Sequence, residues 1–432
     1  MNYHSTRGQC AAVGIDAALA AGLAPDGGLY VPESLPQLSA ADFAGLVNLP
    51  EIAARLLQPF FDGSRLQSQL PVLCAEAFDF PAPLRELDAQ TALLELFHGP
   101  TAAFKDFAAR FLAASLERLR KADAPVTTVL VATSGDTGAA VAAAFHRRPG
   151  FRVVVLYPDG RVSPRQAHQL GCFGDNVMAL RVAGSFDDCQ ALVKRALKDE
   201  ALRQDCALTS ANSISLGRWL PQMGYYVAST LAHQRSHGEA LDFIVPTGNL
   251  GNALAAVLAK ACGLPIGDIV LASNANRVLP EFFASGQYTP RASIATLANA
   301  MDVGSPSNFE RLRWLYPDFK DLPAWLHADA VDDDAIRTTI RAVWAERGIA
   351  VCPHTATALC VAQRLRAQGN ARKMAIVATA HPAKFEQIVE PLIGSALDVP
   401  AALATLLARP AHATPIAADF DELARVLRAA QD

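Results

Sequence analysis

Short apolar runs rich in valine and isoleucine alternate along the chain with longer stretches that carry apolar residues at helical spacing. A continuous apolar run of roughly four to eight residues is typical of a strand that is buried on both faces. Strands that alternate with helices favour an α/β protein with parallel sheets. The runs that we predict to be strands are 126–132, 152–156, 177–182, 242–245, 268–272 and 374–378.

The clearest helix start along the chain is Ser185, which follows the strand predicted over 177–182. A serine is a natural N-cap, and Asp187 and Asp188 place negative charge in the first helical turn. An amphipathic pattern then continues to about residue 205. The pattern predicts a surface helix over this stretch.

The two ends of the chain differ from the middle. Residues 1–80 are dominated by turns and short helices, so we treat them as an N-terminal unit; its small-residue stretch 11–24 contains Asp16, which favours an amphipathic helix over a signal peptide. We predict an α/β core over 81–400, with a smaller subdomain at about 100–205 and a larger one from the remainder. The Ala-rich residues 401–432 indicate a C-terminal helical segment.

Composition excludes several classes of protein. The 432 residues are 51% hydrophobic and carry a net charge of −4 with no basic run, which disfavours nucleic-acid and anionic-membrane partners. We find no uninterrupted apolar run of membrane-spanning length. The eight cysteines are scattered without a C-x-x-C pair, so we expect reduced thiols in a cytoplasmic enzyme and no metal site.

A glycine loop with the sequence ATSGDTG (132–138) follows one predicted strand and opens the Ala-rich helix predicted over 139–146. Such junctions bind anions, because free backbone N–H groups converge there and the helix dipole favours negative charge. Gly135 and Gly138 permit a tight turn, and the hydroxyls of Ser134 and Thr137 add donors. The loop suits a carboxylate or a phosphate, and a plain turn capped by Thr137 fits the pattern equally well.

A second glycine loop, PTGNLGN (246–252), follows the strand predicted over 242–245 and opens the helix predicted over 253–262. Its side-chain donors are Thr247, Asn249 and Asn252. No lysine occupies the position found in nucleotide-binding P-loops, and the dinucleotide pattern G-x-G-x-x-G is absent. The loop therefore favours a single phosphate ester.

A lysine with aromatic neighbours is the candidate nucleophile. Lys105 lies between Phe104 and Phe107 in the segment HGPTAAFKDF (98–107). Desolvation lowers the pKa of a lysine, and the free amine can condense with an aldehyde cofactor such as pyridoxal phosphate. Alone, such a lysine is more typical of a surface side chain.

Thr379, after the strand 374–378, could donate a hydrogen bond to a pyridine nitrogen or simply cap a turn.

Six segments follow one another along the chain: YHSTRG (3–8), GLAPDGGLYVP (22–32), HGPTAAFKDF (98–107), TSGDTG (133–138), GNLGN (248–252) and TAHPAKF (379–385). Together and in this order they resemble the threonine synthase family, whose members are pyridoxal-phosphate enzymes of fold type II. The resemblance covers nearly the whole chain and is to the longer branch, with an N-terminal extension. It implies a tryptophan synthase β-like α/β fold with two parallel-sheet domains, and a monomer or a homodimer.

The resemblance implies the last step of threonine biosynthesis, in which O-phosphohomoserine and water give threonine and phosphate. It implies that Lys105 links to the cofactor and transfers protons, and that Thr379 meets the pyridine nitrogen. The loop implied to hold the cofactor phosphate comprises Gly248, Asn249, Leu250, Gly251 and Asn252. The loop implied to receive the substrate α-carboxylate comprises Ser134, Gly135, Asp136, Thr137 and Gly138.

Two groups of residues are candidates for the substrate phosphate. One is Ser163 with Arg165, and the other is Asn212 and Ser213 with Arg218. Arginine suits a phosphate because its planar guanidinium can donate two parallel hydrogen bonds.

Two departures from the family pattern keep alternatives open. Ser215 stands where the family usually has asparagine, and Cys352, which we expect to pack rather than react, stands in place of an aspartate. An O-phosphohomoserine phospho-lyase that releases 2-oxobutyrate, a serine or threonine dehydratase, and a non-catalytic binding protein of the same fold stay possible. His98, His354 and His381 lack the spacing of metal ligands, which favours supporting roles.

Overall fold

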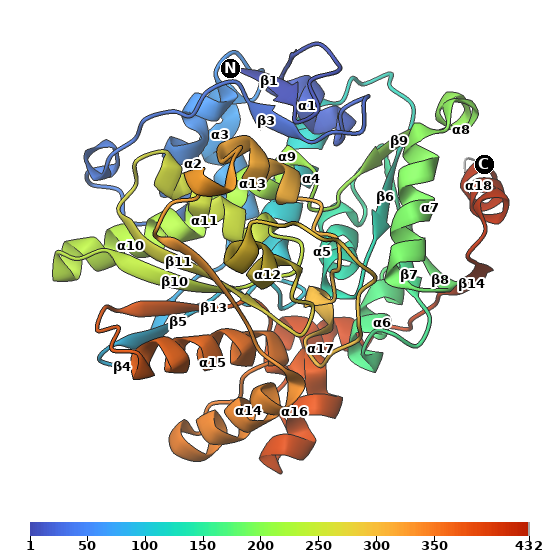
Figure 1. Cartoon of the computed structure of the whole chain (residues 1–432). Helices are drawn as coiled ribbons and strands as arrows, with labels where there is room; N and C mark the ends of the chain where they lie inside the picture. The colour runs from blue at the N-terminus through green and yellow to red at the C-terminus, as the bar shows by residue number, and fades with distance from the viewer. Residues whose placement is uncertain (431–432) are drawn as a thin grey trace.

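The computed structural model describes residues 1–430, which form two α/β units side by side with the N-terminal unit packed across one end (Figure 1). The larger sheet has the order β12–β11–β10–β13–β5–β4. All of its pairings are parallel except β4 with β5. Its strands are β4 (Leu84–Asp88), β5 (Thr91–Glu95), β10 (Leu241–Pro246), β11 (Ile266–Ser273), β12 (Leu326–Ala330) and β13 (Met374–Ala378).

The smaller sheet is parallel throughout and has the order β14–β8–β7–β6–β9. Its strands are β6 (Thr127–Ala132), β7 (Phe151–Pro158), β8 (Val177–Ala183), β9 (Ala207–Ser210) and β14 (Thr414–Ala417). The two sheets confirm the predicted α/β class, and all six predicted strands exist. They were readable from the sequence because helices cover both faces of these strands, which makes almost every position apolar.

Helices account for most of the remaining chain. Those of the N-terminal unit are α1 (Ile15–Ala21), α2 (Leu49–Leu57) and α3 (Leu70–Ala77). Those of the middle are α4 (Lys105–Leu119), α5 (Asp136–Phe145), α6 (Pro164–Gly171), α7 (Phe186–Lys198), α8 (Glu200–Asp205), α9 (Leu216–Trp219), α10 (Met223–His237) and α11 (Gly251–Ala261). The later ones are α12 (Val278–Ser285), α13 (Phe309–Leu315), α14 (Asp333–Arg347), α15 (Pro353–Ala367), α16 (Glu386–Ile393), α17 (Ala401–Leu407) and α18 (Phe420–Ala429). Across residues 1–430 we find no helix with the length and apolar character needed to cross a bilayer.

The helix predicted after Ser185 is interrupted. Ser185 caps α7 through its Oγ, which accepts a hydrogen bond from the N–H of Asp188. Asp199 then ends α7 in an extended conformation and caps α8 by accepting from the N–H of Leu202. The side chain of Asp199 therefore starts a new helix where the amphipathic pattern continues without a break.

The described part of 401–432, predicted as a C-terminal helical segment, contains the two helices α17 and α18 and also a strand that the sequence did not indicate. Strand β14 lies between α17 and α18 and pairs with β8, so that Ile416 lies opposite Val182. Only one of its four residues is buried, and an edge strand this short shows no apolar run. The C-terminal segment thus completes the smaller sheet, and α18 packs against α7 (Figure 1).

The N-terminal unit has a small antiparallel sheet of β1 (Asn2–Ser5), β2 (Val13–Gly14) and β3 (Tyr30–Pro32). Its buried side chains share one apolar core with α4 and α10, which belong to the α/β part of the chain. A domain boundary near residue 80 stays a prediction, because the core continues across it.

Arg311 of α13 joins the N-terminal unit to the middle of the chain. Its buried guanidinium donates to the carbonyls of Tyr30 (3.1 Å) and Ile214 (2.7 Å) and to Oδ1 of Asn308 (2.8 Å). Burial lowers the pKa of Arg311 to about 9, although Glu310 acts in the opposite direction. The segment before α9 is therefore held in place by a cation that is bonded to backbone oxygens.

We expect Arg311→Met to lower the free energy of unfolding by about 3 kcal/mol or more, because buried carbonyls would lose their donors. Urea denaturation of the full chain measures this loss. The control is Arg337→Met, which removes an exposed ion pair with Asp334 and should change stability by about 0.5 kcal/mol or less. Equal losses in the two variants would contradict the bracing role of Arg311.

Candidate active site

A cavity lies where the carboxyl ends of β6, β10 and β13 face each other between the two sheets. Ligands of open α/β sheets bind at this edge of the strands. Segments that are far apart in the sequence converge on it, and most of the predicted site residues line it. Those residues are Lys105, Ser134, Asp136, Thr137, Asn212, Ser213, Arg218, Gly248, Asn249, Leu250, Gly251, Asn252 and Thr379.

Lys105 is the first residue of α4 and points into this cavity. Its Nζ lies 4.6 Å from the centroid of the Phe104 ring and 3.8 Å from Oδ2 of Asp136. Burial lowers the pKa of Lys105 to about 8; Asp136 opposes this shift, and the positive charge of Lys384 adds to it. A useful fraction of this amine is therefore uncharged near neutral pH.

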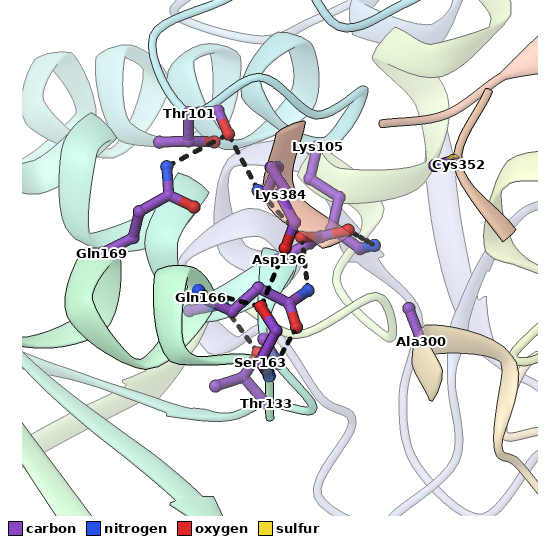
Figure 2. A network of polar contacts seen from close by, with 12 residues as sticks. Thr101, Lys105, Thr133, Asp136, Ser163, Gln166, Gln169, Ala300, Cys352 and Lys384 are labelled. Atoms are coloured by element: carbon purple, nitrogen blue, oxygen red, sulfur yellow. Dashed lines mark hydrogen bonds and ion pairs between the residues drawn. The ribbon is translucent and has the colours of Figure 1, made fainter. Parts of the chain in front are cut away.

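Asp136 lies between two lysines, as Figure 2 shows. Nζ of Lys384 lies 2.8 Å from Oδ1 of Asp136, and Nε2 of Gln166 donates to the same oxygen at 2.9 Å. Burial acts to raise the pKa of Asp136, but Lys384 and Lys105 outweigh it and hold the pKa well below its ordinary value. Asp136 is thus a buried, ionised carboxylate at the start of α5.

The loop before α5 is held by Thr133. Its Oγ1 accepts hydrogen bonds from the N–H groups of Gly135 and Gly138, both at 2.9 Å, so these two donors are already used. Gly135 has φ of +135°, and a Cβ there would lie 2.5 Å from Nε2 of Gln166. The helix begins at Asp136, three residues earlier than predicted, so Thr137 is not its cap. The first-turn N–H groups of Asp136 and Thr137 have no intrahelical acceptor.

The second glycine loop combines strain with close packing. Leu250 has φ of +64°, and a Cβ on Gly248 would lie 2.7 Å from Cα of Met301. Asn249 is fixed on both sides: its Nδ2 donates to Oγ of Ser213 (2.6 Å) and its Oδ1 accepts from the N–H of Ser307 (2.5 Å). Strained backbone is a recurring property of ligand sites.

Asn252 completes that loop at the start of α11. Its Oδ1 accepts from the hydroxyls of Tyr225 (2.5 Å) and Tyr226 (2.9 Å). Its Nδ2 is buried and has no hydrogen-bond partner within residues 1–430. The amide thus keeps a donor for a ligand, in addition to the free N–H groups at the start of an eleven-residue helix.

Arg218 is a buried cation without an acid. Its Nη1 donates to the carbonyl of Ala211 (2.6 Å), its Nε has no partner, and no carboxylate in the described part of the chain pairs with it. Burial lowers the pKa of Arg218 to about 10, while Asp106 and Tyr225 act to raise it. A buried charge is costly unless an anion offsets it, so this arrangement indicates an anionic ligand.

The structure places the other pair of phosphate candidates elsewhere. Oγ of Ser163 donates to the carbonyl of Lys384 (2.8 Å), and Nη1 of Arg165 donates to that of Ala383 (2.6 Å). Arg165 also faces Glu386 (3.7 Å) and Glu390 (3.9 Å). Neither residue lines the cavity, because both fasten α6 to the segment Pro382–Phe385. The prediction that they bind the substrate phosphate does not agree with this placement.

His354, Cys352 and Ser215 lie around the site; the last two are the residues that depart from the family pattern. Nε2 of His354 accepts from the N–H of Ala300 (3.1 Å), and burial lowers the pKa of His354 to about 4, so the ring is neutral. Cys352 is fully buried, with Sγ 3.3 Å from Oγ1 of Thr355. Ser215 is buried too, and neither Cys352 nor Ser215 lines the cavity.

These groups fit a cofactor that carries both an aldehyde and a phosphate. Lys105 offers the amine, and the unpaired Nδ2 of Asn252 and the α11 N-terminus offer donors for a phosphate. Thr379, which is nearly buried, lies at the end of β13 on the same cavity.

Sequence reasoning missed the role of Lys384, Gln166 and the two tyrosines of α10. Lys384 is part of the segment TAHPAKF, but nothing in that segment indicates that its lysine is buried. Its partner Asp136 is almost 250 residues away, and only the tertiary fold brings the two together.

Comparison with known families agrees with the fold and with the order of these segments. The family model described as "Pyridoxal-phosphate dependent enzyme" matches residues 78–382. The models "Threonine synthase N terminus" and "Threonine synthase, C-terminal" match residues 2–78 and 355–427.

Individual relatives agree over the full length. Threonine synthase of Escherichia coli (strain K12) is 40% identical over 413 residues, which cover 95% of both chains. The crystal structure of threonine synthase from Escherichia coli superposes with a TM-score of 0.92 at 38% identity and covers 100% of both chains. The pyridoxal-phosphate-bound threonine synthase from Brucella melitensis gives 0.88 at 34% identity over 99% of both chains. With three matching family models and relatives of this similarity, the chain belongs to the threonine synthase family of pyridoxal-phosphate-dependent enzymes.

Proposed function

We propose that the protein converts O-phosphohomoserine and water into threonine and phosphate with bound pyridoxal phosphate. The observation that carries the proposal is Arg218, a buried guanidinium on the same cavity as Lys105 that has no carboxylate partner within residues 1–430. An amino-acid substrate with a phosphate on its side chain supplies the missing anion. A dehydratase substrate, which has no phosphate, leaves this charge uncompensated.

The cofactor is held by three parts of the chain in this proposal. Lys105 links to its aldehyde carbon, the loop Gly248 to Asn252 holds its phosphate, and Thr379 meets its pyridine nitrogen. When bound, the cofactor supplies a ring that accepts electrons from the carbon atoms next to the substrate amine. The hydroxyl of Thr379 can donate a hydrogen bond to the ring nitrogen without giving up its proton.

The substrate is held at both ends. Ser134, Thr137 and the first-turn N–H groups of α5 receive the α-carboxylate, and Arg218 receives the phosphate together with Ser213 and Asn212. The Asn212 side chain already bridges to the end of β6, where its Nδ2 donates to the carbonyl of Ala132 (2.8 Å). This bond uses one of the two hydrogens on Nδ2, so Asn212 fixes the position of Ser213 and keeps one donor for the phosphate.

Lys105 carries the protons. Because the pKa of Lys105 is lowered to about 8, its Nζ accepts a proton from Cα of the substrate once this nitrogen is no longer linked to the cofactor. The same nitrogen later returns a proton to the product. Arg218 accelerates the reaction if it binds the phosphate more tightly as the bond from phosphate oxygen to Cγ breaks, since only interactions that strengthen in the transition state increase the rate.

The proposal also includes a cytoplasmic location and a monomer or homodimer. The chemistry of the cysteines supports the location: all eight are free thiols, and seven of them are buried.

A product assay tests the reaction. With pyridoxal phosphate and O-phosphohomoserine, we expect the purified protein to release threonine and phosphate in equal amounts. The assay quantifies threonine, 2-oxobutyrate and phosphate together. Phosphate accompanied by 2-oxobutyrate would identify a phospho-lyase instead, and the absence of phosphate release would reject the proposed substrate.

We expect Lys105→Ala to lose the absorbance of the lysine-linked cofactor and to lower kcat by about 10²- to 10⁴-fold or more, because the proton acceptor is removed. Absorbance spectra and steady-state rates measure the two effects. Lys320→Ala, at an exposed lysine that does not line the cavity, serves as the control and should behave like the unchanged chain. Undiminished turnover in Lys105→Ala would refute the assignment.

We expect Arg218→Gln to weaken binding of O-phosphohomoserine by about 10- to 100-fold, since a charge-assisted hydrogen bond contributes about 1.5–3 kcal/mol. Binding of homoserine, which lacks the phosphate, should change much less. Arg337→Gln is the matched control, because Arg337 forms an exposed ion pair with Asp334 and does not line the cavity. Equal weakening of both ligands by Arg218→Gln would argue against a phosphate contact.

A further inference from the structure

Lys384 is a completely buried lysine that does not line the cavity. It belongs to the 3₁₀ helix Pro382–Phe385, which follows β13 in the larger unit. Its Nζ has two partners, Oδ1 of Asp136 (2.8 Å) and the carbonyl of Thr101 (2.8 Å). Figure 2 shows this ammonium on one side of Asp136 and Lys105 on the other.

The backbone around Lys384 is fixed by the smaller unit. Its own carbonyl accepts from Oγ of Ser163, and the preceding carbonyl of Ala383 accepts from Arg165. Gln166 of the same helix α6 donates to Asp136. Lys384 and Asp136 are therefore held against each other by bonds that cross between the two units.

The charges that face Lys105 come from five elements. Asp136 of α5 and Asp106 of α4 favour its protonated form, whereas Lys384 and Arg218 of α9 disfavour it. His354 of α15, the fifth, is neutral, because burial lowers its pKa to about 4. Asp136 and Lys384 therefore act on Lys105 in opposite directions and offset each other.

We propose that Lys384 is a positioning residue that neutralises Asp136, so that the nitrogen of Lys105 gives up its proton readily and the loop 134–138 accepts an anionic substrate group. The part that concerns the substrate rests on the proposed function. The part that concerns Lys105 needs only the cofactor. Without Lys384, the carboxylate of Asp136 would attract the proton on Lys105 and repel the α-carboxylate.

The test is a pH titration of the cofactor absorbance in the holoenzyme of Lys384→Met. Asp136 keeps Lys105, Gln166 and the start of α5 beside it, so it stays ionised in this variant. The nitrogen of Lys105, bonded to the cofactor, should then hold its proton to a pH about one unit higher than in the unchanged chain. A titration at the unchanged pH overturns the proposal.

The double variant Asp136→Asn/Lys384→Met removes both charges and provides the second arm. We expect its titration to return toward that of the unchanged chain, and Lys384→Arg, which keeps the charge, to stay near it. A double variant that keeps the shift of Lys384→Met overturns the proposal. If Lys384→Met does not fold, the double variant decides: it should fold, and its failure to fold alongside a folded Asp136→Asn overturns the proposal.

The two proposals fail in different measurements. The absorbance titration uses no substrate, so it judges Lys384 even where the product assay rejects O-phosphohomoserine. Conversely, an unchanged chain that makes threonine supports the proposed reaction whatever the titration of Lys384→Met shows. A higher KM for the substrate in Lys384→Met that returns toward the original value in the double variant supports the second part of the proposal. That part states that the loop 134–138 accepts an anionic substrate group because Lys384 neutralises Asp136.

Discussion

The site depends on one electrostatic constraint, which is that three charged groups from three different segments are buried together. Asp136 and Lys384 have almost no contact with water, and the side chain of Lys105 is only 15% exposed, so each charge would be costly there by itself. Together they leave one excess positive charge, and Gln166 and Thr101 satisfy further hydrogen bonds. Because the groups belong to both α/β units, moving the units apart would leave buried charges unpaired. This free-energy cost also holds the two units in their relative position.

The N-terminal unit supports the same site from another direction. Arg311 bonds to carbonyls of Tyr30 in β3 and of Ile214 in the segment that carries Asn212, Ser213 and Arg218. An ion pair of 2.9 Å between Arg7 and Glu310 attaches the turn that follows β1 to α13. The residues that would receive a substrate phosphate thus depend on packing that begins at the first few residues of the chain.

Local patterns in the sequence were sufficient for both glycine loops and for six strands, β6, β7, β8, β10, β11 and β13, but not for β4, β5, β9, β12 and β14 of the same two sheets. Apolar runs identify strands that are covered on both faces, and glycines at strand ends identify loops such as the one around Gly135. The edge strand β14 was missed because its four residues include only one buried side chain. The roles of Lys384 and Arg165 could not be predicted, since they depend on partners such as Asp136 and Ala383 that lie more than 200 residues away.

Arg165 and Arg218 show why such roles are settled by surroundings rather than by residue type. Arg165 has two glutamates and a backbone carbonyl beside it, so its charge is already compensated. Arg218 is more deeply buried, has an unpaired Nε, and faces a cavity in which the one carboxylate, Asp136, is taken by two lysines. Because Asp136 is paired with Lys384, it does not compete with an incoming anion for Arg218. Within residues 1–430, the lack of a paired acid therefore favours Arg218 over Arg165 as the cation for an incoming anion.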